Sequence, residues 1–290
     1  MGDDFDVVVV GSLHLDIVVK GPRLPARDET VMGHTWSFKC GGKGGNQAVA
    51  AAKCGARTGF VGCVGEDDFG SRLVANLDKA GVDRSHVRID PLLGSGMSAA
   101  IEDADGDYNA VVVSGANQNI LPTQLKGIAA RVLLIQNEIA AGINLDAART
   151  LRRGGAFVIY NTAPFLPLSK DLMQHIDLIV ANRVEATEAT GIAISSLDEA
   201  LRAAKALSTR ECSAIVTAGE LGSVTWTREG EPHVNPAHEV QVVSTHGAGD
   251  LFCGTLAARL AQEIDLRLAV IDANLAAAQF VSGFSSRAID

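Results

Sequence analysis

Short runs of apolar residues recur along the chain, and most are bounded by glycine or by polar residues. The first run, residues 5–11, is rich in β-branched side chains and ends in glycine, which indicates a buried strand. Runs of the same kind predict the further strands of the core. In chain order they cover residues 58–64, 132–136, 157–161, 178–181 and 214–217.

Helical patterns lie between these runs. Residues 44–54 and 67–80 read as helices, and Gly81 directly after the second is a common helix-ending residue. Residues 144–153 and 197–207 show the same periodicity. Strands that alternate with helices predict an α/β fold, with a doubly wound, mostly parallel sheet flanked by helices and joined by right-handed crossovers.

Two segments depart from this alternation. Residues 12–40 lack a helical pattern, and residues 97–113 read as a hairpin whose strands, 98–101 and 108–113, flank an Asp-Gly turn. We expect two insertions, at about 12–40 and 94–114, to form a small β-sheet on one domain of residues 1–290. Such a sheet could act as a lid that excludes water from a transfer reaction, and surface decoration is the alternative interpretation.

The composition of the chain limits the classes of partner and ligand that it could bind. A chain of 290 residues that is 47% hydrophobic can bury one sizeable core. Its formal net charge of −9 disfavours a nucleic-acid partner, because phosphate backbones are held by an excess of Lys and Arg. An anionic ligand would instead be captured locally, by backbone N–H groups at a helix N-terminus.

The cellular setting is predicted from cysteine usage and from the first residues. The five cysteines form no C-x-x-C pair, which favours reduced thiols packed as small hydrophobes over a zinc site. The acidic N-terminus is not typical of a signal peptide, and apolar runs such as residues 7–10 are too short to span a bilayer. We therefore expect a soluble, cytoplasmic protein with no membrane partner.

The strongest chemical signal lies in residues 242–254. An apolar strand is predicted to lead into a glycine-rich turn, with a helix from about Ala248. Backbone N–H groups of Gly247, Ala248 and Gly249 would then form an anion hole suited to phosphate. Asp250, in the first helical turn, could take a proton from an attacking hydroxyl. A helix-capping Asp after a glycine turn is the alternative interpretation.

A second glycine-rich stretch, residues 40–48, also opens a helix. Its glycines would let a ligand approach the backbone, and Lys43 and Asn46 offer polar contacts about one turn apart. The spacing matches neither the P-loop nor the dinucleotide-binding fingerprint. A flexible glycine loop without a ligand is the other interpretation.

These stretches, taken in order, resemble the ribokinase-like carbohydrate kinases, also called the PfkB family. The resemblance extends over nearly the whole chain. The matching stretches are residues 11–16, 41–48, 62–70, 161–164, 182–185, 217–222 and 245–250. It implies ATP-dependent phosphorylation of a hydroxyl of a small sugar, with D-ribose favoured, Asp250 as general base and the backbone of Gly247, Ala248 and Gly249 as anion hole.

The resemblance also implies binding roles. Substrate hydroxyls would be held by Asp16, Gly42, Lys43, Asn46 and Glu138. Asn182 and Glu185 would organise Mg²⁺ through water, since oxygen ligands suit a hard cation. ATP would be contacted by Asn182, Thr217, Gly219, Gly222 and Asn274. The alternatives are surface carboxylates at strand ends for Asp16 and Glu138, although ligands bind there in doubly wound sheets, and a solvated helix-start residue for Glu185.

The chain departs from the family pattern at the site that binds a monovalent cation. Ser244 stands where the family usually has an Asp that helps to bind this cation, and residues 280–287 replace a glycine-containing loop that supplies further ligands. A neutral hydroxyl binds a cation more weakly than a carboxylate. We therefore expect activation by K⁺ to be weak or absent.

Two other functions stay open. A nucleoside kinase of the same family would use the same ribose contacts, although the predicted lid has few aromatic residues to stack on a base. A sugar- or nucleotide-binding protein descended from a kinase is supported by Ser244 and the altered C-terminal segment, and is opposed by the intact Asp250 motif. An exposed lid edge also predicts a homodimer formed through the lid.

Overall fold

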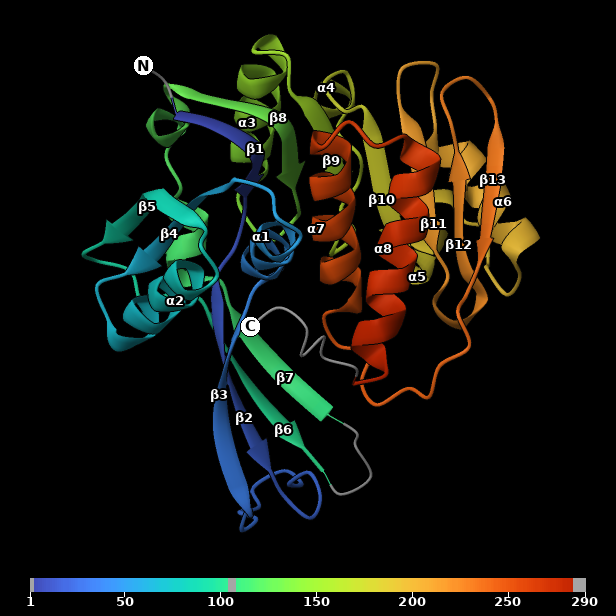
Figure 1. Cartoon of the computed structure of the whole chain (residues 1–290). Coiled ribbons are helices and arrows are strands. Elements are labelled where there is room, and N and C mark those ends of the chain that lie inside the picture. Colours follow the sequence, from blue (N-terminus) through green and yellow to red (C-terminus); the bar gives the residue numbers. More distant parts are fainter. Residues whose placement is uncertain (1–2, 104–107, 284–290) are drawn as a thin grey trace.

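A large twisted sheet forms the centre of the molecule, and a smaller sheet projects from one end of it (Figure 1). The computed structural model describes residues 3–103 and 108–283. The strands of the large sheet are, in spatial order, β13 (Pro232–Pro236), β12 (Gly222–Trp226), β11 (Ser213–Thr217), β10 (Leu178–Asn182), β9 (Phe157–Asn161), β8 (Ile128–Ile135), β1 (Asp3–Val10), β4 (Thr58–Gly65) and β5 (Asp83–Asp90).

The large sheet is mostly parallel, as the alternating pattern predicted. Neighbouring strands from β11 to β5 run parallel, and β12 and β13 add an antiparallel edge. The consecutive valines of β1 are fully buried. Val8 and Val10 belong to one core cluster, and Val7 and Val9 belong to the other. A continuous apolar run therefore marks a strand that is covered on both faces.

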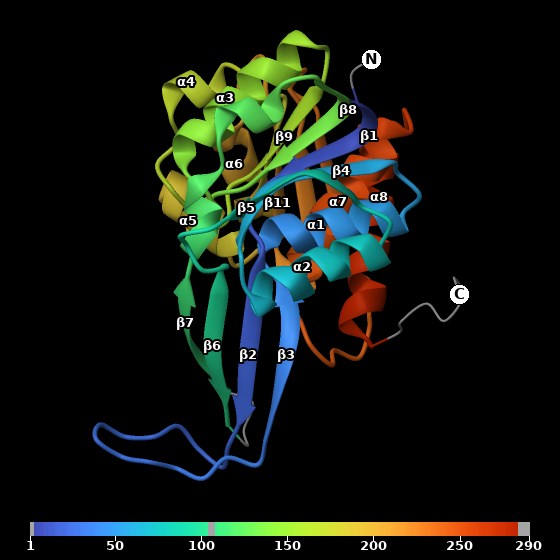
Figure 2. The same ribbon diagram turned by 90° about the vertical axis from the view of Figure 1, so that its left-hand side faces the viewer.

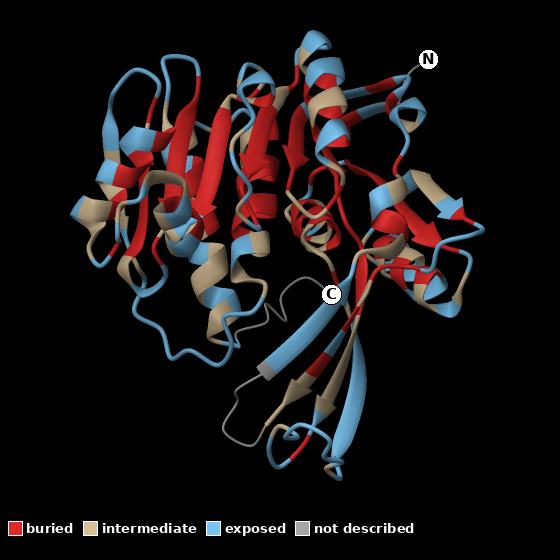
Figure 3. Cartoon of the chain, turned by 180° about the vertical axis from the view of Figure 1, so that it is seen from behind, coloured by how far each residue is buried: buried red, intermediate tan, exposed pale blue. Residues whose placement is uncertain are grey.

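Helices cover both faces of this sheet. On one face lie α1 (Lys43–Lys53), α2 (Asp68–Lys79), α7 (Ala248–Ala261) and α8 (Leu266–Val281), as Figure 1 shows. On the other lie α3 (Ala141–Arg153), α4 (Lys170–Met173), α5 (Arg183–Thr190) and α6 (Leu197–Leu207), with the 3₁₀ turns η1 (Gly115–Asn119) and η2 (Pro122–Leu125). Seen from behind, the buried residues concentrate in the large sheet and in the helix faces turned toward it (Figure 3).

The small sheet that the two irregular segments predicted is present. Its strands, in spatial order, are β3 (Thr35–Gly41), β2 (His14–Lys20), β6 (Met97–Glu102) and β7 (Tyr108–Val113). Antiparallel β2–β3 and β6–β7 pairs are joined through a parallel β2–β6 pair. Figure 2 shows the sheet extending away from the main body. Most of the predicted Asp-Gly turn, residues 104–107, lies outside the described residues.

One predicted strand is wrong. Residues 237–247, all of which the structure describes, form no strand before α7. Val242 and Val243 are 58% and 73% exposed, so no sheet buries them. The segment runs from the end of β13 to α7 and touches the end of α8 instead, where the Val243 N–H donates to the Val281 carbonyl at 2.7 Å. The helix predicted to begin at about Ala248 is confirmed.

No helix within residues 3–103 and 108–283 is long and apolar enough to cross a bilayer.

Candidate active site

A cavity of about 160 Å³ opens where the carboxyl ends of β9, β10 and β11 meet the N-terminus of α7. Many residues predicted from separate motifs line it together. They are Lys43, Asn182, Glu185, Thr217, Gly247, Gly249 and Asp250. In doubly wound sheets this edge is where ligands bind.

Asp250 is half-buried in the wall of this cavity and is held by two side-chain amides. The Asn46 Nδ2 group donates to Oδ2 at 2.9 Å, and the Gln47 Nε2 group donates to Oδ1 at 3.1 Å. Burial raises the pKa of Asp250 to about 6, while the Lys43 charge and the two amides act in the opposite direction. The carboxylate is thus ionised at neutral pH and is more basic than an exposed Asp, which suits a general base.

Gln47 is a site residue that the sequence did not single out. It is fully buried, and its Nε2 group also contacts the Asn161 carbonyl Oδ1 at 3.0 Å. The Asn161 Nδ2 group in turn donates to the Val180 carbonyl at 3.1 Å. A relay of amides therefore connects β10 and β9 to Asp250. The signal in the sequence that could have identified Gln47 is a polar residue on the buried, Ala-rich face of α1.

The turn before α7 has the backbone that an anion hole requires. Gly247 has a φ of 92°, which favours glycine. A Cβ added to Gly249 would have no described atom within 4 Å, so it would project into open space at the cavity. Glycine here leaves the N–H groups of the first turn accessible, as binding of a phosphate at a helix N-terminus requires.

The glycines at the start of α1 also serve close packing. Gly42 has a φ of 86°, and a Cβ there would lie 2.8 Å from the Ser12 carbonyl oxygen. A Cβ on Gly44 would lie 2.6 Å from the Ser12 backbone nitrogen. The Gly45 N–H donates to the Ser12 carbonyl at 2.9 Å. The motif therefore brings the first turn of α1 onto the β1–β2 loop, a role that the sequence-based interpretation did not include.

Glu138 is tied directly to this helix start. Its Oε2 atom accepts hydrogen bonds from the Lys43 backbone N–H at 2.9 Å and from the Ser12 hydroxyl. The His14 Nδ1 atom lies 3.7 Å from the same oxygen. Burial lowers the pKa of His14, which favours its neutral form. These hydrogen bonds fix the Glu138 carboxylate next to Lys43.

Asp16 reaches the same region from the small sheet. It is half-buried on β2, and the Ser98 hydroxyl of β6 donates to its Oδ1 atom. A Cβ on Gly41 would lie 2.5 Å from its Oδ2 atom, so the carboxylate rests against the backbone that leads into α1. The structure thus brings Asp16 and Glu138 to the same end of one helix from two different sheets.

Asn182 and Glu185 form a reciprocal cap at the start of α5. The Glu185 N–H donates to the Asn182 Oδ1 atom, and Glu185 accepts from the Asn182 backbone N–H and side-chain amide, each at 2.9 Å. Glu185 is only 7% exposed, and burial raises its pKa. The interpretation of Glu185 as a solvated helix-start residue is therefore wrong. Each carboxylate oxygen keeps the capacity for a second partner.

The other residues predicted to contact ATP lie beyond the cavity wall. Gly219 opens the turn η3 (Gly219–Leu221), and Gly222 follows it. A Cβ on Gly222 would lie 2.1 Å from the Asn235 carbonyl oxygen, so this glycine allows β12 and β13 to pair. The Asn274 Nδ2 group donates to the Ser223 hydroxyl at 2.8 Å, which connects α8 to β12.

The residues predicted to organise Mg²⁺, Asn182 and Glu185, line the cavity, whereas Ser244, at the predicted monovalent-cation site, does not. Ser244 is exposed in the segment before α7, where its hydroxyl accepts from the His246 N–H at 3.4 Å. Across residues 3–103 and 108–283, no three or more His, Cys, Asp or Glu side chains gather in a way that could hold a metal ion.

Comparisons with known proteins identify the family of this chain. Residues 4–289 match the model of the pfkB family carbohydrate kinases. The chain is 35% identical to the ribokinase of Mus musculus over 270 residues, covering 90% of this chain and 84% of the relative. It is 32% identical to the deoxyribokinase of Salmonella typhi over 285 residues, covering 96% and 93%.

Solved structures extend the likeness to three dimensions. The ribokinase of Arabidopsis thaliana, complexed with ribose and ATP, superposes with a TM-score of 0.86 at 29% identity, covering 97% of this chain and 93% of that one. The ribokinase of Cryptococcus neoformans, in complex with ADP, superposes with a TM-score of 0.85 at 26% identity, covering 97% and 94%. The chain therefore belongs to the pfkB family of carbohydrate kinases and is a sugar kinase of the ribokinase type.

Proposed function

We propose that this sugar kinase transfers the γ-phosphoryl group of ATP to a hydroxyl of D-ribose, with Asp250 as the general base. The observation that carries the proposal is the position of Asp250. It is a carboxylate with a raised pKa, held by Asn46 and Gln47, in the first turn of a helix whose N-terminal amides open on the same cavity.

The reaction follows from that position. The attacking hydroxyl gives its proton to Asp250 as its oxygen forms a bond to the γ-phosphorus, and the bond from that phosphorus to the β–γ bridging oxygen breaks. Backbone N–H groups of Gly247, Ala248 and Gly249 stabilise the charge on the transferred group. Asp16, Glu138 and the start of α1 orient the sugar, so that the hydroxyl approaches in line.

The nucleotide side of the site is formed by β10, β11 and α8. Thr217 lines the cavity, Gly219 lies in the turn η3 after β11, and the Asn274 side chain connects α8 to β12, where Gly222 is buried. The buried Glu185 carboxylate with Asn182 fits water-mediated binding of Mg²⁺, which when bound would neutralise phosphate charge. Ser244 offers one neutral oxygen, so the proposal includes weak or absent activation by K⁺.

The relatives support a pentose and leave a second candidate. Ribokinases and a deoxyribokinase match this chain at similar identity, so 2-deoxy-D-ribose is the alternative substrate. A nucleoside is disfavoured by the faces of the small sheet. Asp16 pairs with Lys39 and Ser98, whereas Trp36 and Phe38 alternate with Lys39 along β3 and point to the opposite face. The Asp16 face therefore lacks these two rings for stacking on a base.

The opposite face of the small sheet supports a homodimer. Phe38, Ile17, Ala99 and Val111 stand side by side in one row across all four strands. Val111 is 69% exposed, and Trp36 on the same face is 64% exposed. An exposed apolar face of this kind is typical of a subunit interface. A second copy of this chain, packed through the small sheet, is the partner that we propose.

The test is ADP release from ATP over a panel of D-ribose, 2-deoxy-D-ribose, hexoses and nucleosides, with Na⁺ or K⁺ as the monovalent salt. We expect the highest kcat/KM with D-ribose, little difference between the salts, and a kcat about 10²- to 10⁴-fold lower in Asp250→Asn. Retained turnover in Asp250→Asn would remove the base assignment. No substrate-dependent ADP release by the parent protein would favour a binding protein instead.

A further inference from the structure

The 3₁₀ turn η1 follows the small sheet and connects it to three other parts of the molecule. Its central residue, Asn117, is fully buried. The Asn117 Oδ1 atom accepts from the Leu13 N–H at 2.9 Å, and the Asn117 Nδ2 group donates to the Leu13 carbonyl at 2.8 Å. Leu13 lies in the loop from β1 to β2, at the point where the chain enters the small sheet. One side-chain amide thus satisfies both backbone groups of that residue.

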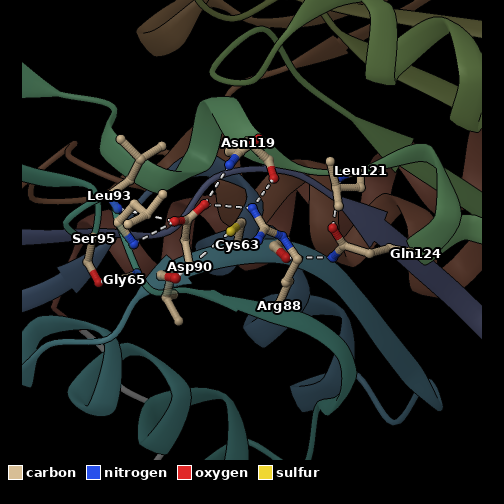
Figure 4. Close-up of polar contacts among 12 residues, drawn as sticks. Cys63, Gly65, Arg88, Asp90, Leu93, Ser95, Asn119, Leu121 and Gln124 are labelled. Atoms are coloured by element: carbon tan, nitrogen blue, oxygen red, sulfur yellow. Dashed lines mark hydrogen bonds and ion pairs between the residues drawn. The ribbon is translucent and has the colours of Figure 1, made fainter.

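The neighbours of Asn117 fix η1 to the main body. The Gln118 Nε2 group donates to the Glu138 carbonyl at 3.2 Å. The Asn119 side chain donates to Asp90 at the end of β5, and the Arg88 guanidinium donates both to that carboxylate at 2.6 Å and to the Asn119 carbonyl at 2.8 Å (Figure 4). The hydrogen bond from the Leu92 backbone N–H, followed by those from the Asn119 and Arg88 side chains, holds the pKa of Asp90 well below its usual range.

The backbone packs closely around Asn117. A Cβ on Gly96, just before β6, would lie 2.2 Å from the Asn117 Nδ2 atom and 2.5 Å from the Leu13 carbonyl oxygen. A Cβ on Gly115 would lie 2.3 Å from the Gly94 carbonyl oxygen, which accepts from the Ala116 N–H at 2.8 Å. The segments that enter β2, enter β6 and leave β7 therefore meet at one buried amide.

The chain neighbours of Leu13 reach the carboxylates that we propose bind the sugar. Ser12 and His14, on either side of Leu13, both approach the Glu138 carboxylate. Asp16 follows on the same strand and the same face as His14. The position of Leu13 therefore sets the separation between Asp16 on the small sheet and Glu138 on the main body.

We propose that Asn117 is a positioning residue of the sugar site, which acts through the Leu13 backbone to hold Asp16 and Glu138 in register. The proposal rests on the sugar-kinase function argued above, with the sugar bound between these carboxylates. Asn117 does not touch the cavity and is 104 residues from Leu13 in the chain. Its effect should appear in sugar binding, because the ATP side of the site lies on β10, β11 and α8.

The test compares Asn117→Asp and Asn117→Ala with a matched control. Asn117→Asp keeps the shape and the acceptor for the Leu13 N–H but loses the donor to the Leu13 carbonyl, while Asn117→Ala loses both. The control is Ser213→Ala, at the start of β11, which loses another buried side-chain acceptor, the one that receives the Arg228 N–H at 3.0 Å. Sugar KM, ATP KM, kcat and Tm are measured for each variant.

We expect the sugar KM to rise about tenfold or more in both Asn117 variants, with ATP KM and kcat changed less than about threefold. Ser213→Ala should lower Tm without changing the sugar KM. If the Asn117 variants lose stability and the sugar KM stays at the parent value, Asn117 has only a structural role and the proposal is wrong. If Asn117→Ala does not fold, Asn117→Asp decides the matter.

Hydrogen–deuterium exchange tests the contact between Asn117 and Leu13 independently of activity, because it measures the protection of backbone N–H groups. The N–H groups of Leu13, Leu15 and Ala116 should exchange faster in both Asn117 variants, while those of β11 stay protected. Unchanged protection at these three amides would refute the anchoring role whichever sugar is used. By contrast, a parent protein that phosphorylates no sugar would refute the proposed function, and with it the role in sugar binding, whatever the exchange shows.

Discussion

At the residue scale, the proposed role of Asp250 as general base depends on the balance between its burial and its hydrogen bonds. Burial favours the protonated carboxyl, and the Asn46 and Gln47 amides together with the Lys43 charge favour the carboxylate. The outcome is a pKa of about 6, between that of an exposed Asp and neutral pH. A base tuned in this way can be ionised before the reaction and still accept a proton during it.

This balance predicts the pH dependence of kcat/KM for the sugar. A base must be ionised, so kcat/KM should be level above pH 7 and fall about tenfold per unit below the Asp250 pKa of about 6. Gln47→Leu removes one donor to the carboxylate, which raises the Asp250 pKa and moves this fall to higher pH. Tm measured over the same pH range separates the effect from unfolding. An acid limb that remains near pH 4 in both proteins would contradict the assignment.

The sequence supports proposals for residues whose chemistry can be argued locally, but it did not predict the contacts that are made across the chain. Asp250 and Gly249 follow from one short helix start, so their roles could be argued from spacing alone. Gln47 and Asn117 could not, because their partners lie 203 and 104 residues away. A buried amide in an Ala-rich helix or in a short turn carries no sequence signal until the fold brings its partner to it.

At the element scale, the glycines of the site make room either for a ligand or for another part of the protein. Gly249 at the start of α7 leaves space for a ligand, since a Cβ there would have no described neighbour within 4 Å. Gly222 at the start of β12 has a φ of 111° and leaves space for the protein itself, because a Cβ would meet the Asn235 carbonyl. Both residues belong to glycine-rich stretches, and the sequence alone does not separate the two uses.

A pair of substitutions should distinguish these two uses of glycine. Gly249→Ala should leave the free energy of unfolding within about 0.5 kcal/mol of the parent and lower kcat/KM for ATP by about tenfold or more, because the methyl group would block the anion hole. Gly222→Ala should destabilise the fold by on the order of 2 kcal/mol. Urea titration and ADP release measure the two effects. A Gly249→Ala enzyme with unchanged kinetics would mean that the anion is not bound at this turn.

Elements were predictable where burial and periodicity agree. The strands β1, β4, β8, β9, β10 and β11 are buried on both faces, so their apolar runs identified them. The antiparallel edge formed by β12 and β13 was missed, since β13 alternates between exposed and half-buried residues and contains two prolines. The apolar pair Val242 and Val243 was taken for a strand, although no neighbouring strand pairs with it in the described structure. Pairing partners are a property of the fold rather than of the local sequence.

At the scale of the whole molecule, the small sheet has two faces of opposite character. Alternation along its strands places Lys39, Asp16 and Ser98 in one row, and Phe38, Ile17 and Ala99 in the next row on the other face. The polar row contains Asp16 and so belongs to the face that we propose for the sugar. The apolar face of a sheet needs a partner, and no described element of this chain buries Val111 or Trp36. Two such faces packed against each other would meet this need with closed two-fold symmetry.

A charge placed on either face of β7 tests this association. Val111→Lys puts an ammonium group on the apolar face, where burial against a second copy would leave it unpaired, so we expect a monomer. Val112→Lys is the matched control, because Val112 is 59% exposed but lies on the opposite face beside Ser98. Size-exclusion chromatography with light scattering should show twice the chain mass for the parent and for Val112→Lys. A parent protein that is monomeric at micromolar concentration would refute the dimer, and a dimeric Val111→Lys would place its interface elsewhere.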